Sequence, residues 1–226
     1  MNIGGEQLYR LLLVLPGLLL SLTVHEFAHA RVALAFGDPT AKLMGRVTLN
    51  PLRHLDPMGT IMLVLTAMGS FGIGWAKPVP VNQANLHPRR LGDIMVSLAG
   101  PAGNLALAAV VLGLVKLWML IPAGFLGTAV LYTGHEMLLL LLLTNVGLAI
   151  FNLIPLFPLD GHHILREILP SIMAEGFMRW QVRYGSMALM ILILGPWLLH
   201  RMGSSISLDP LRTVMVHVRH WVLVLV

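Results

Sequence analysis

Residues 25–29 read His-Glu-Phe-Ala-His, and the types and spacing of these residues could bind a metal ion. Positions four apart lie on the same face of a helix, so His25 and His29 can direct both imidazoles at one ion. Glu26 would then lie near a metal-bound water molecule and could act as its general base. The pattern therefore predicts a site that activates water on a metal ion.

A catalytic zinc ion takes three protein ligands and keeps a fourth position open, so another residue must complete the site. Six side chains elsewhere in the chain could do so: His54, His135, Glu136, Asp160, His162 and His163. Asp160 is favoured, because prolines at 155 and 158 interrupt the preceding helix and Gly161 permits a tight turn that can aim the carboxylate. An aspartate next to a glycine is also common in plain turns, and this alternative stays open.

The composition indicates what kind of fold must position these residues. Hydrophobic residues make up 57% of the 226 positions and charged residues 11%, whereas a soluble domain carries about 25% charge. The chain has no cysteine, which excludes a disulfide-stapled secreted domain, and an ordinary soluble enzyme or a disordered chain is excluded by the hydrophobicity. Most of the chain must therefore lie in a lipid bilayer.

Four apolar stretches are long enough to cross about 30 Å of hydrocarbon: residues 8–35, 91–120, 132–153 and 184–199. The His-Glu-Phe-Ala-His pattern thus lies near the end of the first span. A fifth stretch, 208–226, is apolar but contains arginines and histidines, so a span and an interfacial position both stay open. We expect an all-α polytopic membrane protein with about four to six transmembrane helices.

Residues 57–74 are apolar but short, and they end in a glycine-rich run that forms helix poorly. Basic residues such as Arg53 and Lys77 flank this piece, so both flanks are cytoplasmic by the positive-inside rule. We therefore expect a re-entrant or small β element after the first helix. This topology puts the N-terminus outside and Asp160 at the same membrane level as His25 and His29.

The chain is expected to form one integral-membrane domain over 1–226, with a core at 8–166 and C-terminal helices at 184–226. Its net charge of +5 is typical of loops that face anionic lipid, and the dispersed basic residues do not indicate nucleic-acid binding. Residues 75–81 could be an edge strand that binds an unwound substrate segment. The alternative is an interfacial loop anchored by Trp75.

Several separated motifs together resemble the site-2 protease family. They are HEFAH at 25–29, GRVTLNP at 45–51, AGPAGN at 99–104, and Asn152 followed eight residues later by Asp160-Gly161. The resemblance covers about residues 8–166 and is to the short bacterial or archaeal form, which has no inserted PDZ domain. It implies an intramembrane zinc metalloprotease that cleaves membrane proteins within or near their transmembrane segments, in regulated intramembrane proteolysis.

The resemblance also implies roles for particular residues. His25, His29 and Asp160 match the zinc ligands, one Zn²⁺ per chain, and Glu26 matches the catalytic base. Asn152 matches a position that contacts the substrate backbone. One departure is visible, because the family usually has a second glycine where this chain has His162.

Two further residues have two interpretations each. Asn104, in the Gly-Pro-x-x-Asn motif, either lines the active site and binds substrate or joins helices by hydrogen bonding. His54 either helps to stabilise the oxyanion or is an ordinary loop histidine.

The expected setting is a prokaryotic cell membrane, with the active site toward the cytoplasm. The expected partners are a transmembrane protein substrate and the lipid bilayer, and a homo-oligomer stays open. Two rival functions remain. One is another membrane zincin, with Glu167 or Glu175 as the third ligand, and the other is a metal transporter or sensor without hydrolysis.

Overall fold

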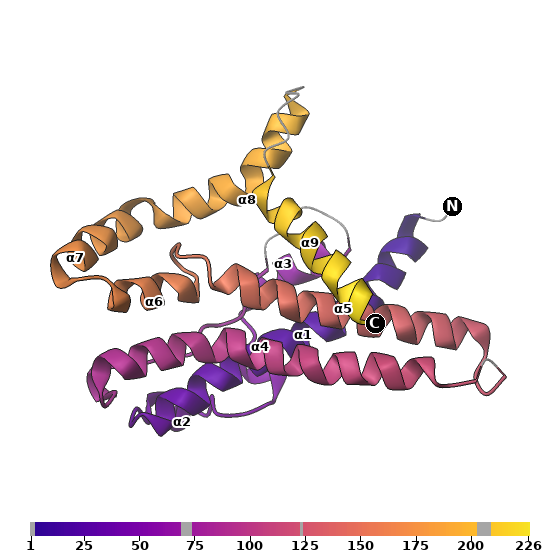
Figure 1. The fold of residues 1–226 in the computed structure, drawn as a ribbon, viewed down its shortest axis with the longest axis horizontal. Coiled ribbons are helices and arrows are strands. Elements are labelled where there is room, and N and C mark those ends of the chain that lie inside the picture. The colour runs from indigo at the N-terminus through magenta and orange to yellow at the C-terminus, as the bar shows by residue number, and fades with distance from the viewer. Residues whose placement is uncertain (1–2, 69–73, 123, 203–208) are drawn as a thin grey trace.

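The computed structural model describes residues 3–68, 74–122, 124–202 and 209–226. Four of its helical stretches are long and apolar enough to cross a membrane. They are α1 (Ile3–Ala35), α4 (Arg89–Met119), α5 (Thr128–Asn152) and the stretch from Ser171 to Arg201. The last consists of α7 (Ser171–Trp180), a π-helical turn (Gln181–Gly185) and α8 (Ser186–Arg201). The all-α polytopic fold expected from the sequence is confirmed (Figure 1).

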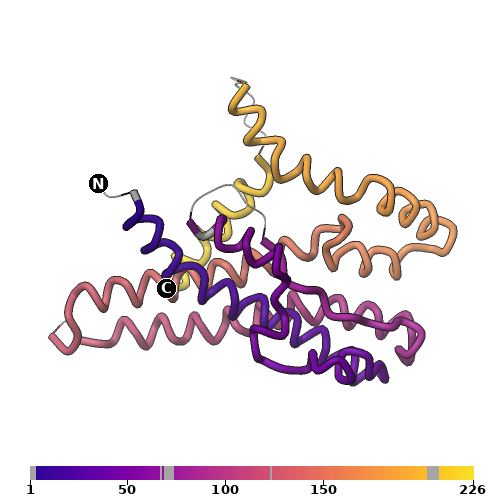
Figure 2. Tube along the Cα trace, turned by 180° about the vertical axis from the view of Figure 1, so that it is seen from behind, coloured from indigo at the N-terminus to yellow at the C-terminus, as the bar shows by residue number. Residues whose placement is uncertain are grey.

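Shorter helices lie between and after these long ones. They are α2 (Thr40–Leu43), α3 (Pro57–Ala67), α6 (Asp160–Ile168) and α9 (Pro210–Leu225), with 3₁₀ turns at Pro51–Arg53 and Gln83–Asn85. The helices α1, α4 and α5 lie side by side, as both ribbon views show (Figures 1 and 2). Small residues permit this close approach: a Cβ at Gly103 of α4 would lie 3.0 Å from Ala28 Cβ of α1.

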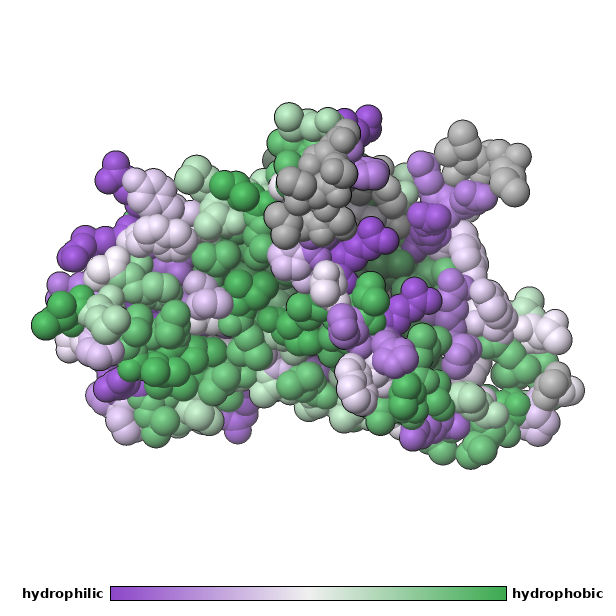
Figure 3. All heavy atoms as spheres, turned by 45° about the horizontal axis from the view of Figure 1, so that its top comes forward, coloured by the Kyte–Doolittle hydropathy of each residue, from purple (hydrophilic) through white to green (hydrophobic). Residues whose placement is uncertain are grey.

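Hydrophobic side chains lie both inside this bundle and over its surface. A buried cluster of Ala108, Val111 and Val115 from α4 packs against Leu142 of α5 and Val222 of α9. Many large apolar side chains are nevertheless exposed, and green hydrophobic atoms cover much of the face drawn in Figure 3. Such a surface suits contact with lipid chains rather than water.

The chain segments on the two sides of the piece at 57–74 lie next to each other. Helix α3 has 11 residues and is therefore about 16 Å long, too short to cross the hydrocarbon. The Lys77 N–H donates to the His54 carbonyl at 2.8 Å, and Leu55 and Ala76 form an isolated antiparallel bridge. The two flanks of the piece thus lie together, as a re-entrant element requires, and its glycine-rich part at 69–73 lies outside the described residues.

The C-terminal region differs from the sequence expectation in where its helix begins. The fourth span was expected at 184–199, yet the helical stretch starts at Ser171. Its first turns carry an exposed pair of charges, Glu175 and Arg179. Hydropathy therefore marks where the apolar part begins, and the helix extends beyond it.

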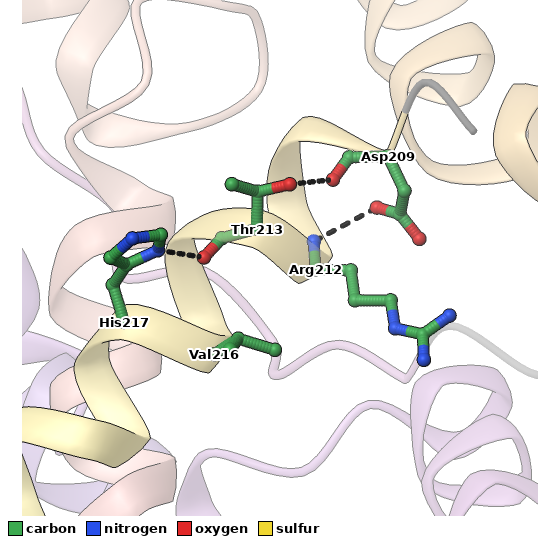
Figure 4. A pocket seen from close by; sticks show the side chains of 5 residues that line it. All are labelled: Asp209, Arg212, Thr213, Val216 and His217. Atoms are coloured by element: carbon green, nitrogen blue, oxygen red, sulfur yellow. Dashed lines mark hydrogen bonds between the residues drawn. The ribbon is translucent and has the colours of Figure 1, made fainter. Parts of the chain in front are cut away.

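Helix α9, in the fifth apolar stretch, has 16 residues and is about 24 Å long. At its start, Asp209 caps the helix by accepting the Arg212 N–H at 2.8 Å (Figure 4). The pocket beside this cap is lined by Asp209, Arg212, Thr213, Val216 and His217. The other bonds drawn there also run within the helix, from Thr213 to the Asp209 carbonyl and from His217 to the Thr213 carbonyl.

Candidate metal centre

Three side chains that are far apart in the sequence converge where α1 meets the start of α6. His25 Nε2 and His29 Nε2 lie 3.2 and 3.4 Å from Asp160 Oδ2, and the two Nε2 atoms are 3.0 Å apart. Ligand atoms about 2.0–2.2 Å from a tetrahedral zinc ion would be separated by similar distances. Among the described residues, this is the only group of three side chains with metal-ligand spacing.

The oxygen at the centre of this group supports a metal site. Asp160 Oδ2 is buried and has no hydrogen bond of acceptable geometry. A buried carboxylate oxygen that has no hydrogen-bond donor and faces two imidazole nitrogens fits a divalent cation.

Helix α4 sets the orientation of both histidines. His29 Nδ1 lies 2.7 Å from the Val96 carbonyl, and His25 Nδ1 lies 2.7 Å from Asn104 Oδ1. Since a carbonyl can only accept, we assign the ring proton of each histidine to Nδ1, which leaves each Nε2 lone pair for the metal. Gly100 makes room, because a Cβ there would lie 2.3 Å from His29 Nε2.

The loop between α5 and α6 delivers Asp160, and the π-helical turn holds this loop. The fully buried Gln181 accepts the Phe157 N–H at 2.9 Å and donates to the Pro155 carbonyl at 2.6 Å. Gly161 permits the sharp entry into α6, since a Cβ there would lie 2.3 Å from the Leu153 carbonyl oxygen. The sequence analysis missed Gln181. The one signal that could have indicated it is the position of this amide side chain next to an apolar stretch.

The carboxylate of Glu26 is held by the segment at 75–81, which follows the re-entrant element. Its Oε2 accepts the Val79 N–H at 3.0 Å. The guanidinium of Arg46 donates to the carbonyls of Arg53, Lys77 and Pro78, and so fixes this segment beside the site. The sequence analysis gave no role to Arg46, and a backbone donor such as the Val79 N–H leaves no residue-type signal.

A second anchor lies where α1 ends. Asp38 is fully buried and accepts from Thr40 N–H, Thr40 O–H, Asn82 N–H and the Asn85 amide. Burial raises the pKa of Asp38, but the hydrogen bonds from Thr40, Asn85 and Asn82 together lower it below its usual value. This carboxylate ties the chain after the re-entrant segment to the end of the helix that carries His25 and His29.

The other predicted site residues lie in different surroundings. Asn104 contacts His25, as described above, whereas the Asn152 amide donates to the Leu148 carbonyl of its own helix at 2.9 Å. His54 is buried, and its Nε2 lies 2.8 Å from the Thr48 carbonyl within the loop. The structure thus brings Asn104 to the histidines and records no contact of Asn152 or His54 with them.

The remaining candidates for third ligand, His135, Glu136, His162 and His163, lie outside the group of His25, His29 and Asp160. Glu136 accepts from the Tyr9 hydroxyl at 3.0 Å, near the N-terminal ends of α5 and α1. Buried His162 hydrogen-bonds the Leu159 carbonyl through Nδ1. Burial, with His162 and Arg166 nearby, lowers the pKa of His163 to about 4, so this imidazole is neutral at pH 7.

The two glutamates of the rival zincin reading also pair away from the histidines. Glu167 pairs with Arg166, and Glu175 pairs with Arg179. Neither belongs to the group of His25, His29 and Asp160.

One family model and several curated proteins are similar to this chain. The family described as "Peptidase family M50" matches residues 119–195. "Putative zinc metalloprotease YwhC" of Bacillus subtilis is 40% identical over 181 residues, which cover 79% of this chain and 78% of that protein.

More distant relatives are longer than the region they share. "Putative zinc metalloprotease Rip2" of Mycolicibacterium smegmatis is 38% identical over 159 residues, 70% of this chain and 58% of that protein. "Zinc metalloprotease MJ0392" of Methanocaldococcus jannaschii is 29% identical over 152 residues, 67% of this chain and 33% of that protein. No solved structure matches the chain.

Proposed function

The chain belongs to Peptidase family M50, the site-2 protease family, and we propose that it is an intramembrane zinc metalloprotease that hydrolyses peptide bonds within or near transmembrane segments. The relatives' names and the apolar helices support a zinc metalloprotease of the membrane. The observation that carries the proposal is the convergence of His25 and His29 on the buried Oδ2 atom of Asp160, which has no hydrogen-bond donor.

The chain's own residues divide the chemistry between them. His25, His29 and Asp160 would hold the ion, which when bound supplies an acidified water molecule and polarises the scissile carbonyl. Glu26 is the base for the proton of that water and returns a proton to the leaving amine. Because the Val79 N–H occupies Oε2 of Glu26, we assign proton transfer to Oε1.

The two candidate substrate-binding asparagines are not equivalent. Both amide hydrogens and the oxygen of Asn104 are used inside the protein, with Ser21, Asn145 and His25. Asn104 is therefore better suited to hold His25 than to bind substrate. Asn152 uses an amide hydrogen on its own helix, and its carbonyl oxygen is the group we assign to a substrate N–H.

The orientation of the site is part of the proposal. His25 and His29 lie near the C-terminal end of the first span, next to loops that contain Lys42, Arg46 and Arg53. By the positive-inside rule, this end faces the cytoplasm of a prokaryotic cell. The substrate would be a membrane protein that reaches the site from the bilayer, with the segment to be cleaved unwound.

Cleavage of a transmembrane peptide in detergent by the Glu26→Gln variant tests the proposed function. We expect this variant to bind zinc like the unaltered protein and to lose cleavage, because glutamine cannot take the proton from water. Glu175→Gln, at an exposed position, is the matched control and should cleave normally. Full cleavage by Glu26→Gln would contradict the proposed role of Glu26. A lack of cleavage by the unaltered, zinc-loaded protein would contradict the proposed function and favour a metal-binding protein without hydrolysis.

A further inference from the structure

A buried polar cluster lies deeper in the bundle than the metal centre. Ser21 of α1, Asn104 of α4 and Asn145 of α5 are all fully buried. Asn104 Nδ2 lies 3.0 Å from the Ser21 carbonyl oxygen and 2.8 Å from Asn145 Oδ1. Asn145 Nδ2 lies 2.8 Å from Ser21 Oγ. Because Asn104 Oδ1 also lies 2.7 Å from His25 Nδ1, the cluster connects directly to the first histidine.

The hydrogen-bond partners fix which way the Asn104 amide faces. Both partners of its nitrogen, the Ser21 carbonyl and Asn145 Oδ1, are oxygens. A reversed amide would place Oδ1 against these two acceptors, and its nitrogen would face His25. His25 would then have to accept at Nδ1 and would carry its proton at Nε2, where the metal should bind.

The direction of the Asn145 amide is fixed in the same way. Its nitrogen has two acceptors, Ser21 Oγ and the Leu141 carbonyl, each at 2.8 Å. The Ser21 hydroxyl donates to the Gly17 carbonyl at 2.7 Å, so Ser21 Oγ is left to accept from Asn145. Every hydrogen in the chain from Gly17 to His25 therefore has one consistent direction.

We propose that Asn145 and Ser21 are positioning residues for the zinc site. They act through Asn104, whose oxygen is held toward His25 Nδ1, so that the ring proton stays on Nδ1 and Nε2 is free for the metal. This inference rests on the proposed function, because it concerns the ligand state of the zinc site. It assigns roles to two residues that carry neither a metal-ligand nor a proton-transfer group.

A purely structural role is the competing explanation, since the same contacts join α1, α4 and α5. The two roles predict different measurements. Helix joining predicts that disrupting the cluster lowers the unfolding temperature of the metal-free protein and leaves the zinc affinity of the folded protein unchanged. Positioning predicts weaker zinc binding by protein that is still folded.

The test is zinc affinity in detergent, measured by competition with a chelator on protein whose helix content and metal-free unfolding temperature are also recorded. Asn145→Leu keeps the size of the side chain and removes its hydrogen bonds. We expect it to weaken zinc binding by about 10- to 100-fold, as for other residues that orient a metal-bound histidine. Ser21→Ala removes the hydroxyl that accepts from Asn145 and donates to the Gly17 carbonyl, but it leaves both asparagines in place and should weaken binding by a smaller factor.

Thr23→Val is the matched control. Thr23 is buried on the same helix, but its hydroxyl bonds the Leu19 carbonyl outside the cluster, so zinc affinity should not change. Should Asn145→Leu not fold, Ser21→Ala decides alone.

The inference is overturned if folded Asn145→Leu or folded Ser21→Ala binds zinc as tightly as the unaltered protein, or if Thr23→Val loses as much affinity. Failure of the proposed function would look different. In that case the unaltered protein would bind zinc no better than a His25→Gln variant, or would bind it without cleaving peptide.

Discussion

The metal centre is packed against backbone at Gly100, and this contact makes its geometry sensitive to one carbon atom. A Cβ at this position would lie 2.3 Å from His29 Nε2 and 2.5 Å from His25 Cε1. Neither ring can simply turn away, because each is held by a hydrogen bond from its Nδ1 atom to α4. The residue type at position 100 is therefore dictated by the site and not by the helix.

Gly100→Ala should reduce zinc affinity by at least about tenfold, because both imidazoles must shift to admit the methyl group. Zinc content after purification, with affinity by chelator competition, is the measurement. Gly113→Ala on the same helix is the control, since nothing lies within 4 Å of a Cβ there. Equal zinc binding by the two variants would contradict the packing described at Gly100.

Val79 contributes through its backbone rather than its side chain. Val79→Pro removes the N–H that bonds Glu26 Oε2, and a hydrogen bond to a charged group is worth about 1.5–3 kcal/mol. We expect cleavage to fall by about 10- to 100-fold while zinc content stays unchanged. Val79→Ala retains the N–H and should cleave normally.

The same segment bears on how a substrate could bind. Pro78 and Pro80 have no N–H, and Arg46 takes the carbonyls of Lys77 and Pro78. Among residues 77–80, an edge strand would therefore offer a substrate few free backbone N–H and carbonyl groups. Strand addition stays a prediction, and loss of cleavage in Val81→Pro as well as in Val79→Pro would support it.

Contacts between elements bring Asp160 to the histidines. Helix α6 starts at Asp160, the preceding loop is held by Gln181, and Gln181 belongs to the π-helical turn between α7 and α8. The helical stretch from Ser171 to Arg201 thus supports the metal centre indirectly, because its Gln181 holds the loop that precedes Asp160.

Gln181→Leu should leave the Phe157 N–H and the Pro155 carbonyl without partners, at a cost of about 1–3 kcal/mol each. We expect a lower unfolding temperature and weaker zinc binding, because the loop that aims Asp160 loses its anchor. Val182→Ala, at an exposed position of the same turn, should change neither. Unfolding temperature and zinc affinity that match those of Val182→Ala would count against this role for the turn.

Asp38 links the end of α1 to the 82–85 turn, and its ionisation makes that link depend on pH. Its pKa is lower in the folded protein than in the unfolded chain. Its carboxylate therefore stabilises the fold above the unfolded value of about 3.9, and this contribution is lost as pH falls through the lower folded pKa. The unfolding temperatures of the unaltered protein and Asp38→Asn should differ most near neutral pH and converge on acidification. A difference in unfolding temperature that stays the same as the pH is lowered would contradict this role of the Asp38 carboxylate.

Across the whole molecule, features that depend on residues close together in the sequence could be predicted, and most contacts between distant residues could not. The HEFAH pattern is local, so His25, Glu26 and His29 can be read from helical periodicity. The proximity of the two flanks of 57–74 could be inferred from their charges, and the topology drawn from it predicted that Asp160 lies on the same side as His25 and His29, beside which the structure places it. These inferences need only hydropathy, charge and helix geometry.

The supporting residues could not be inferred in this way. Asn145 meets Ser21 across 124 positions, and Val79 meets Glu26 across 53. Such contacts depend on how the helices pack. The sequence does not indicate which residue an asparagine in an apolar helix, or a backbone N–H, will bond. The start of the last long helix at Ser171 was missed for a related reason, because exposed charges continue a helix beyond its apolar part.

The central claim is that Asp160 completes a zinc site with His25 and His29. Zinc content per chain should be measured on the unaltered protein, Asp160→Asn and the control Glu167→Gln, purified side by side. We predict one zinc per chain in the unaltered protein and in Glu167→Gln, and a loss of zinc in Asp160→Asn. Full zinc occupancy in Asp160→Asn, or loss of zinc in Glu167→Gln alone, would contradict the account.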